Sequence, residues 1–284
     1  MKHPEWIKLR LPIPSESDKI IDILKKNNVA TVCHHALCPN KGECWNTGHA
    51  TFMVLGSHCS RNCLFCNVES KTPLAVDVSE PARVAAAVIE MNLEYVVVTS
   101  VTRDDLIDKG AGHLAAVVDE IKKQDTNILV ELLIPDLAGN KNFIEKIVSV
   151  RPDVIAHNIE MPRSLYPKIR KQSSYETSLY VLKTIKEIDP KMITKSSIII
   201  GLGETIKEII ETFDDLKQIN IDILYVGQYL SPSKEHWPVA KYYTPEEFKE
   251  IQIIAFEMGF KAVMAEPLVR SSYKAASSYR QVCK

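Results

Sequence analysis

Short apolar runs alternate with longer amphipathic segments along most of this chain of 284 residues. The apolar runs predict strands buried on both faces, at residues 51–56, 94–99, 127–134, 153–159, 193–200, 223–229 and 262–265. Apolar positions at helical spacing predict helices between them, at residues 81–91, 111–123, 142–150, 175–188, 205–219 and 245–258. The last helix has the clearest end signals, since Thr244 and Glu247 can form a capping box and Gly259 follows its end.

The regular spacing of these elements predicts an α/β fold. The predicted strands begin about 25 to 45 residues apart, which is the length of one strand–helix unit and favours a parallel sheet. Repetition of this unit predicts a partial TIM-type (β/α)6 barrel, with a doubly wound open sheet as the alternative. We expect an extension at residues 1–50, the barrel at 51–265 and a short C-terminal segment at 266–284. In barrels of this kind, the chemistry lies on the loops that follow the strands.

Composition and charge narrow the class of protein. Hydrophobic residues make up 45% and charged residues 25% of the chain, which excludes wholesale disorder. Lys and Arg number 35 against 36 Asp and Glu, so the net charge of -1 provides no general attraction for nucleic acid or an anionic membrane. The sequence has neither a secretory signal nor an apolar run of membrane-spanning length. We therefore expect a cytoplasmic protein that binds neither nucleic acid nor membrane.

Six of the seven cysteines lie between positions 33 and 66, in two groups of three. The second group, Cys59, Cys63 and Cys66, follows the first predicted strand. Three thiolates are one ligand short of a closed structural zinc site, whereas they suit a four-iron cluster that keeps one iron open. His58 is the candidate fourth ligand in the zinc alternative. The spacing and the loop after a strand favour the cluster.

The first group, Cys33, Cys38 and Cys44, lies in the N-terminal extension and again has no fourth cysteine nearby. Taken alone, it is equally compatible with a zinc site that is completed by a histidine, for which the candidates are His34, His35 and His49. Beside a second set of three cysteines, it is better interpreted as a second iron–sulfur cluster. The remaining cysteine, Cys283, is expected to be a free thiol near the chain end.

The Cys59 group, with Phe65 before its last cysteine, resembles the radical S-adenosylmethionine superfamily. Similarity to its lipoyl synthase family extends over nearly the whole chain. It is carried above all by the spacing of the Cys33 group and by Arg270-Ser271-Ser272-Tyr273. Further matching segments are Pro4-Glu5-Trp6-Ile7-Lys8, Arg103-Asp104-Asp105, His157-Asn158-Ile159-Glu160, Gly201-Leu202-Gly203-Glu204-Thr205 and Gly227-Gln228-Tyr229-Leu230.

This resemblance implies the activity and the cofactors. In the family, two S-adenosylmethionine molecules are cleaved in succession, and the resulting radicals remove hydrogen from carbons six and eight of a carrier-bound octanoyl chain. Two sulfur atoms then enter from an auxiliary [4Fe–4S] cluster, which makes the enzyme a sulfurtransferase. The implied partners are an octanoylated lipoyl carrier domain (a 2-oxoacid dehydrogenase acyltransferase subunit or a glycine cleavage H protein) and an electron donor such as ferredoxin or flavodoxin.

The resemblance also implies the ligands of both clusters. Cys59, Cys63 and Cys66 would bind the cluster that holds S-adenosylmethionine, and Cys33, Cys38 and Cys44 would bind the auxiliary cluster. The auxiliary cluster's fourth ligand in the family is a serine, which we place at Ser272 with Ser271 as the alternative. Arg270 is expected to position this serine or the substrate chain.

The candidates for the S-adenosylmethionine pocket lie near the ends of predicted strands; they are Thr99, Ser100, Arg103, Asn158, Glu160, Gly201, Gly203 and Glu204. Two parts of this set, the Gly201–Glu204 segment and Glu160, also have a structural explanation that involves no cofactor. The Gly201–Glu204 sequence is also that of a tight strand-to-helix turn, and Glu160 is compatible with an exposed surface position. The basic run of Lys168, Arg170 and Lys171 is best explained as a solvated helix face.

Two other classes of protein remain as alternatives. Another sulfur-transferring radical enzyme, such as a biotin synthase or a methylthiotransferase, fits poorly because no cysteine lies between Cys66 and Cys283 and no large N-terminal domain is present. A non-enzymatic zinc protein would use both cysteine groups structurally. The chain also departs from the lipoyl synthase pattern at His34-His35, at Asn67 and at Ala265-Glu266, none of which is an expected ligand.

Overall fold

The structure is a computed structural model that describes residues 3–284; residues 1 and 2 of the expected extension lie outside the described part. Its strands follow one another in a mostly parallel sheet of order β1-β2-β3-β4-β5-β6-β7-β8. This sequential order confirms the α/β barrel class and excludes the doubly wound alternative, in which the strand order reverses. No helix within residues 3–284 has the length and apolar character that crossing a bilayer requires.

The seven predicted strands are all present, with bounds that lie within three residues of the predicted ones. They are β2 (Thr51–Val54), β3 (Tyr95–Ser100), β4 (Leu129–Leu133), β5 (Val154–Ala156), β6 (Ile193–Ile200), β7 (Ile223–Gln228) and β8 (Ala262–Glu266). The six predicted helices are also confirmed, as α4 (Glu80–Glu90), α5 (Ala111–Gln124), α6 (Lys141–Ser149), α8 (Tyr175–Ile188), α9 (Ile206–Gln218) and α10 (Pro245–Glu257). The Thr244–Glu247 capping box of α10 forms as expected.

One longer helix, α1, and several short elements were not predicted. They are α1 (Pro14–Lys26), β1 (Ala30–Thr31), α2 (Val32–His35), α3 (Lys41–Asn46), α7 (Tyr166–Ile169), α11 (Ala275–Val282) and the 3-10 turns η1 (Leu137–Gly139) and η2 (Arg163–Leu165). Most have too few turns to produce a periodic pattern. The N-terminal extension and the C-terminal segment are therefore more regular than the sequence indicates.

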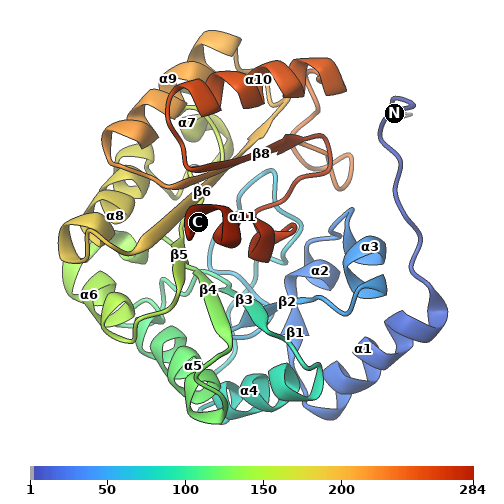
Figure 1. The fold of residues 1–284 in the computed structure, drawn as a ribbon, viewed down its shortest axis with the longest axis vertical. Helices are drawn as coiled ribbons and strands as arrows, with labels where there is room; N and C mark the ends of the chain where they lie inside the picture. Colours follow the sequence, from blue (N-terminus) through green and yellow to red (C-terminus); the bar gives the residue numbers. More distant parts are fainter. Residues whose placement is uncertain (1–2) are drawn as a thin grey trace. The chain divides into compact units, whose positions relative to one another are not determined.

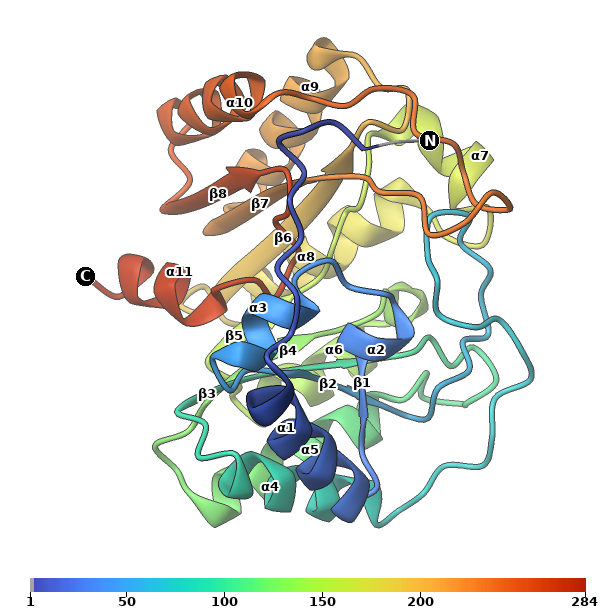
Figure 2. The same cartoon turned by 90° about the vertical axis from the view of Figure 1, so that its right-hand side faces the viewer.

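The chain divides into two compact units, which we describe separately. The N-terminal unit comprises Leu9–Asn62 and Asn67–Ile155. In it, β1 pairs antiparallel with β2, and β2, β3 and β4 pair in parallel. Helices α1, α4 and α5 lie on one side of these strands, and α2 and α3 lie on the other (Figures 1 and 2).

The C-terminal unit comprises Cys63–Cys66 and Ala156–Lys284, together with the N-terminal residues up to Lys8. Strands β6, β7 and β8 pair in parallel. Helices α9 and α10 cover one face of these strands, and α11 lies on the opposite face (Figures 1 and 2). The buried core lies on the α9/α10 face, where Leu224 and Val226 of β7 pack with Phe213 and Phe248. The other face of β7 is left for the C-terminal segment.

Candidate functional site

The loop after β2 carries Cys59 and is fastened to its own unit by backbone hydrogen bonds. Cys59 N donates to Glu69 O at 2.8 Å, and Ser60 N donates to Thr102 O at 3.0 Å. The amide of Arg61 points at the Cys59 Sγ, with a separation of 3.4 Å. An N–H group directed at a sulfur stabilises negative charge on it, which suits a thiolate ligand.

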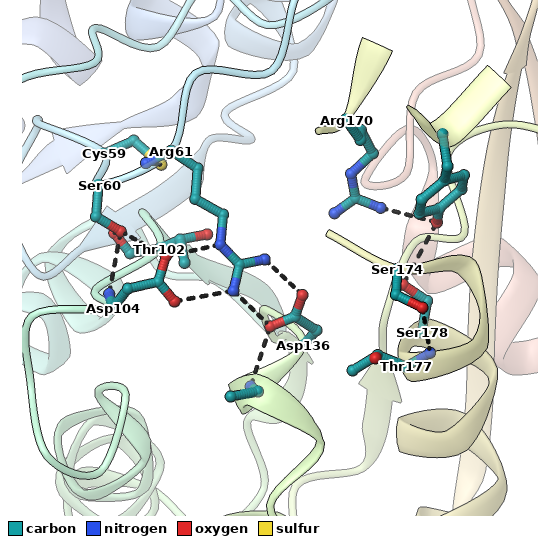
Figure 3. A network of polar contacts seen from close by, with 12 residues as sticks. Cys59, Ser60, Arg61, Thr102, Asp104, Asp136, Arg170, Ser174, Thr177 and Ser178 are labelled. Carbon is teal, nitrogen blue, oxygen red and sulfur yellow. Dashed lines mark hydrogen bonds and ion pairs between the residues drawn. The ribbon is translucent and has the colours of Figure 1, made fainter. Parts of the chain in front are cut away.

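Arg61 lies at the centre of a polar network in the N-terminal unit (Figure 3). Its Nε and one Nη donate to the two oxygens of Asp104, at 2.7 and 2.8 Å. Its guanidinium also donates to both oxygens of Asp136, at 2.5 and 2.9 Å. Ser60 Oγ bonds Asp104 as well, at 3.0 Å. Because Asp104 follows β3 and Asp136 follows β4, one side chain joins the loops after three consecutive strands.

The charges in this network stabilise one another. Burial alone lowers the pKa of Arg61, but its hydrogen bonds with Asp104 and Asp136 raise the pKa overall. The hydrogen bond from Arg61 is also the main reason why the pKa of Asp104 lies below its usual range. Arg61 and Asp104 therefore stay charged near neutral pH, and the ion pairs of Arg61 fix the loop that carries Cys59. Arg61 lies between two expected ligands in the sequence, and this position is the signal that could have identified it.

Residues 63–66 are fastened in the C-terminal unit. Leu64 N donates to Ile169 O at 3.0 Å, and Trp237 N donates to Leu64 O at 2.8 Å. Cys66 N closes a turn onto Cys63 O at 3.0 Å, and His236 Nε2 lies 3.2 Å from Cys66 O. The backbone around Cys63 and Cys66 is thus held on both sides within this unit.

The Cys33 group lies on two short helices and the turn between them. Cys33 is buried in α2, and Cys44 lies in α3. Cys38 N donates to Cys33 O at 3.2 Å. In α3, a Cβ on Gly42 would lie 2.1 Å from Arg10 O. Only glycine at this position therefore allows the backbone around Arg10 to pack against α3.

The cysteines are chemically available as ligands. None of the seven forms a disulfide bond. Within residues 3–284, however, no group of three or more His, Cys, Asp or Glu side chains is gathered closely enough to hold a metal ion. Six reduced thiols in two sets of three fit the donor chemistry of iron–sulfur clusters. The membership of each ligand set therefore still depends on the sequence spacing and the family resemblance.

Two positions that depart from the family pattern are linked to each other. The side-chain amide of Asn67 donates to the His35 carbonyl oxygen at 2.8 Å. An aspartate at this position would present an acceptor to an acceptor. The contact ties the chain just after Cys66 to helix α2, which carries Cys33. Nearby, His58 Nε2 lies 3.3 Å from a carboxylate oxygen of Glu69, which gives this histidine a partner in the protein.

Thr99, Ser100 and Arg103 lie at and just after the end of β3, as predicted. Thr99 Oγ1 donates to Leu133 O at 3.1 Å, whereas the buried Ser100 Oγ has no hydrogen-bond partner among the described residues. The Arg103 guanidinium binds Asp105 and also donates to the Leu55 carbonyl at 3.2 Å. Arg103 thus supports the loop after β2. Of the hydroxyl groups of Thr99 and Ser100, only that of Ser100 has no hydrogen-bond partner among the described residues.

Asn158 and Glu160 follow β5 and lie in a strongly desolvated site. Burial raises the pKa of Glu160, and the nearby charges of Arg170 and Arg270 and a hydrogen bond from Asn158 act against that rise. Asn158 Oδ1 is buried without a hydrogen-bond partner among the described residues. An unsatisfied buried acceptor beside a buried acid indicates a site for a polar ligand. The surface alternative for Glu160 is wrong.

Glu160 also has an unusual backbone conformation. Its φ of 66° lies in the left-handed region, which is uncommon for a residue with a side chain. Its N–H and C=O bond to Ser197 and Ile199 at 2.9 and 2.8 Å, so the neighbouring strand β6 holds this conformation in place. Strain of this kind is frequently found at functional sites.

The basic run near α7 is not uniformly solvated. Lys168 and Lys171 are exposed, but Arg170 is half-buried. The Arg170 guanidinium donates to the Tyr166 hydroxyl at 2.9 Å and packs over that ring, 5.1 Å from its centroid. Figure 3 shows Arg170 among Ser174, Thr177 and Ser178, which belong to the start of α8. The interpretation as a solvated helix face is therefore wrong for Arg170.

The Gly201–Glu204 segment forms a closed turn between β6 and α9. Both glycines have positive φ values, 102° and 117°. The Glu204 carboxylate accepts hydrogen bonds from the amides of Gly201 and Leu202, at 2.6 and 2.9 Å. Tyr243 donates to Glu204 from its hydroxyl at 3.1 Å. A nucleotide at this turn would have to use other groups than these two amides.

The Arg270–Tyr273 segment lies between β8 and α11. Ser271 and Ser272 are half-buried, and Tyr273 is buried. Tyr273 N donates to Arg270 O at 2.8 Å, which closes a turn around the two serines. Arg270 Nη1 donates to the Val269 carbonyl oxygen at 2.7 Å. The geometry of the turn makes both serine side chains accessible and does not distinguish between them.

Comparisons with known proteins identify the family to which this chain is similar. The chain matches the radical SAM superfamily over residues 53–216. It is 47% identical over 274 residues to a protein named lipoyl synthase from Caldicellulosiruptor saccharolyticus, covering 96% of both chains. It is also 47% identical over 277 residues to a lipoyl synthase from Alkaliphilus metalliredigens, covering 98% of this chain and 96% of that relative.

Solved structures agree with the fold. HydG, a maturase of the [FeFe]-hydrogenase, superposes with a TM-score of 0.60 at 13% sequence identity, covering 94% of this chain and 67% of HydG. Coproporphyrinogen III oxidase (HemN) from Escherichia coli, a radical SAM enzyme, superposes with a TM-score of 0.52 at 12% identity, covering 73% of this chain and 52% of HemN. At these identities the likeness concerns the fold alone.

Proposed function

Because this chain belongs to the lipoyl synthase family of the radical S-adenosylmethionine superfamily, we propose which of its residues carry out that family's reaction. The reaction inserts two sulfur atoms, at carbons six and eight, into an octanoyl chain held on a lipoyl carrier, and consumes two S-adenosylmethionine molecules. The cofactors are S-adenosylmethionine and [4Fe–4S] clusters. The observation that carries this function is the 47% identity over 96% of the chain.

Cys59, Cys63 and Cys66 are the proposed ligands of the cluster that binds S-adenosylmethionine. Three thiolates leave one iron for the amino and carboxylate groups of the cofactor. The proposal is supported by the absence of a disulfide at the three cysteines and by the Arg61 amide that points at Cys59 Sγ. Arg61 itself, through Asp104 and Asp136, keeps this loop in position.

Cys33, Cys38 and Cys44, with Ser272 as fourth ligand, are the proposed ligands of the auxiliary cluster. The choice of Ser272 over Ser271 rests on the family motif. A serine oxygen is a harder ligand than a thiolate and binds iron less tightly, which helps if the cluster is to be taken apart for its sulfur. Arg270, on the same turn, is the proposed positioning residue for the serine or the substrate chain.

The proposed S-adenosylmethionine pocket consists of residues that follow β3, β5 and β6. Ser100 and Asn158 offer buried polar atoms without a protein partner, and Glu160 offers a desolvated carboxylate. The proposed pocket also includes Thr99, Arg103, Gly201, Gly203 and Glu204. Of these, Arg103 and Glu204 would fix the conformation of their own loops through hydrogen bonds. When bound, the cofactors supply the hydrogen-abstracting radical and the sulfur, whereas the protein binds, orients and excludes water.

The substrate is a lipoyl carrier, as for the family. We further propose that the carriers are the acyltransferase subunit of a 2-oxoacid dehydrogenase and the glycine cleavage H protein. Reduced ferredoxin or flavodoxin is the proposed electron donor, and the cytoplasm the proposed compartment. Residues 1–50 would carry the auxiliary cysteines, 51–265 the radical chemistry and 266–284 the serine.

The test is an assay of the reconstituted protein under anaerobic conditions. An octanoylated carrier domain is incubated with the protein, S-adenosylmethionine and reductant, and its mass is then measured. We expect a mass gain that corresponds to two sulfur atoms for two hydrogens. Release of deoxyadenosine without any sulfur on the carrier would indicate another radical enzyme. A colourless protein that holds zinc would contradict the proposal altogether.

A further inference from the structure

Two residues of strand β7, Tyr225 and Gly227, lie on the strand face that is turned away from the hydrophobic core. Side chains alternate along a strand, so Tyr225 and Gly227 share one face while Leu224 and Val226 share the other. Leu224 and Val226 belong to the core on the α9/α10 face. Tyr225 and Gly227 therefore face the side on which α11 lies (Figure 2).

Gly227 is in contact with the segment that precedes the two serines. A Cβ at this position would lie 2.0 Å from the Val269 carbonyl oxygen and 3.2 Å from the Arg270 guanidinium. The first distance is far below any allowed contact, and the obstacle is backbone, which cannot turn aside as a side chain can. The φ angle of Gly227 is not positive, so glycine is required here for space and not for conformation.

Further contacts hold the same segment against β7. Gln228 N donates to Pro267 O at 3.1 Å, and Val269 N closes a turn onto Glu266 O at 3.1 Å. Val269 is 1% exposed, so the contact between this residue and Gly227 is buried. The turn that carries Ser271 and Ser272 begins at the next residue.

The far side of the serine turn is anchored to the same strand. Tyr225 and Ser278 of α11 share a hydrogen bond of 2.7 Å between their hydroxyls, and both residues are almost fully buried. The ammonium group of the buried Lys195 lies 4.0 Å from the centroid of the Tyr225 ring, which fixes the ring from another direction. Helix α11 begins at Ala275, immediately after the turn.

We propose that Gly227 and the Tyr225–Ser278 pair are positioning residues for the serine ligand of the auxiliary cluster. Gly227 fixes the chain just before the serines, and Tyr225 fixes the helix just after them. Because both anchors belong to one strand, the position of the turn is set by β7 and does not depend on the serines. This inference rests on the proposed function, which supplies the ligand role of the serine.

The test compares iron content and iron release in the reconstituted full-length protein. The wild-type protein should hold about eight irons, four in each cluster. In Gly227→Ala, the added methyl group displaces Val269 and the serine turn, so the protein should hold about four irons, with the spectrum of a single S-adenosylmethionine-binding cluster. Gly112→Ala is the matched control, because its Cβ would meet only the ends of the Asp108 and Lys146 side chains.

Two milder variants cover the case in which Gly227→Ala does not fold. Tyr225→Phe and Ser278→Ala each remove one hydroxyl of the anchor. They should bind about eight irons but release half of them to a chelator at least threefold faster than the wild type. Amide hydrogen exchange should also accelerate in residues 267–274, while the loop around Cys59 keeps its wild-type rate.

The outcomes separate this inference from the proposed function. A wild-type protein with about eight irons and normal sulfur insertion, whose Tyr225→Phe and Ser278→Ala variants release iron at the wild-type rate, overturns the positioning role alone. A wild-type protein that never acquires a second cluster overturns the proposed function, whatever the variants do.

Discussion

The guanidinium group of Arg61 and the carboxylate of Asp104 form a two-bond ion pair, with N–O distances of 2.7 and 2.8 Å. The pair joins the loop that contains Cys59 to the loop after β3. Bidentate pairs of this kind fix orientation as well as distance. A lysine could supply the charge at position 61 but not the planar fork that also reaches Asp136.

Replacement of Arg61 by Ala should therefore destabilise the protein strongly. The change leaves Asp136, only 3% exposed, without its countercharge, and loss of a buried partner costs about 3–5 kcal/mol. Urea unfolding of the metal-free protein measures this loss. Arg83→Ala is the control, because the partner of Arg83 is the exposed Asp77. Equal midpoints for the two variants would contradict the structural role of Arg61.

Loss of a cysteine from the Cys33 group should stop sulfur insertion but not the cleavage of S-adenosylmethionine. Cys38→Ala should lose the auxiliary cluster, so that iron falls from about eight to about four per chain, and sulfur insertion stops. Cleavage of S-adenosylmethionine should continue, because the Cys59 group is intact. Cys283→Ala, which changes the exposed thiol near the chain end, should match the wild type. A full product yield from Cys38→Ala would refute the role of this group as sulfur source.

Glu160→Gln should weaken the binding of S-adenosylmethionine. The substitution keeps the shape but replaces a carboxyl oxygen by an amide nitrogen in a desolvated site, and a buried polar group of the cofactor left without its partner costs about 1–3 kcal/mol. We expect at least a tenfold increase in the dissociation constant by equilibrium dialysis with reconstituted protein. Glu211→Gln, on the exposed surface of α9, is the control. Unchanged affinity in Glu160→Gln would remove this residue from the proposed pocket.

Asn67→Asp should destabilise the contact between the chain after Cys66 and helix α2. The amide donates to the His35 carbonyl at 2.8 Å, and a carboxylate there would oppose the carbonyl oxygen. An unsatisfied or repelled polar group costs about 1–3 kcal/mol. Thermal unfolding should show a lower midpoint for Asn67→Asp than for Asn67→Ala, since only the former adds repulsion. A wild-type midpoint for both variants would show that the amide contact contributes nothing.

Stability at low pH should depend on Asp222. Burial alone raises the pKa of Asp222, but hydrogen bonds from Lys186 and Lys261, at 2.6 and 2.7 Å, outweigh this and hold its pKa below the usual value. A carboxylate with a depressed folded-state pKa stabilises the protein above its unfolded-state pKa of about 3.9, and that contribution is lost as the pH falls further.

The free energy of unfolding should consequently decrease below about pH 4, with a shallower slope in Asp222→Asn. Urea titrations between pH 3 and pH 7 measure it. Asp214→Asn, which changes an exposed carboxylate on α9, should keep the wild-type slope. If Asp222→Asn has the wild-type slope as well, the pH dependence arises elsewhere.

Much of the barrel was predictable because its signals are local. Strands such as β5 and β7 are largely apolar runs, and α10 carries its own capping box and terminating glycine. The spacing of the cysteines likewise lies entirely in the sequence. In contrast, α11 and the short helices around Cys33 and Cys44 have too few turns for a periodic pattern, so they depend on contacts made elsewhere in the chain.

Among the candidate site residues, the sequence by itself determined the choice of the proposed thiol ligands, the family and the strand ends on which polar residues occur. Only the tertiary structure decided how the other side chains are used. Arg103 and Glu204 support their own loops, Glu160 is desolvated, and Arg170 is turned onto Tyr166. Arg61 and Gly227 acquire their roles from partners that lie 43 and 42 residues away. Burial and the pairing of distant residues are properties of the folded chain, which local patterns do not contain.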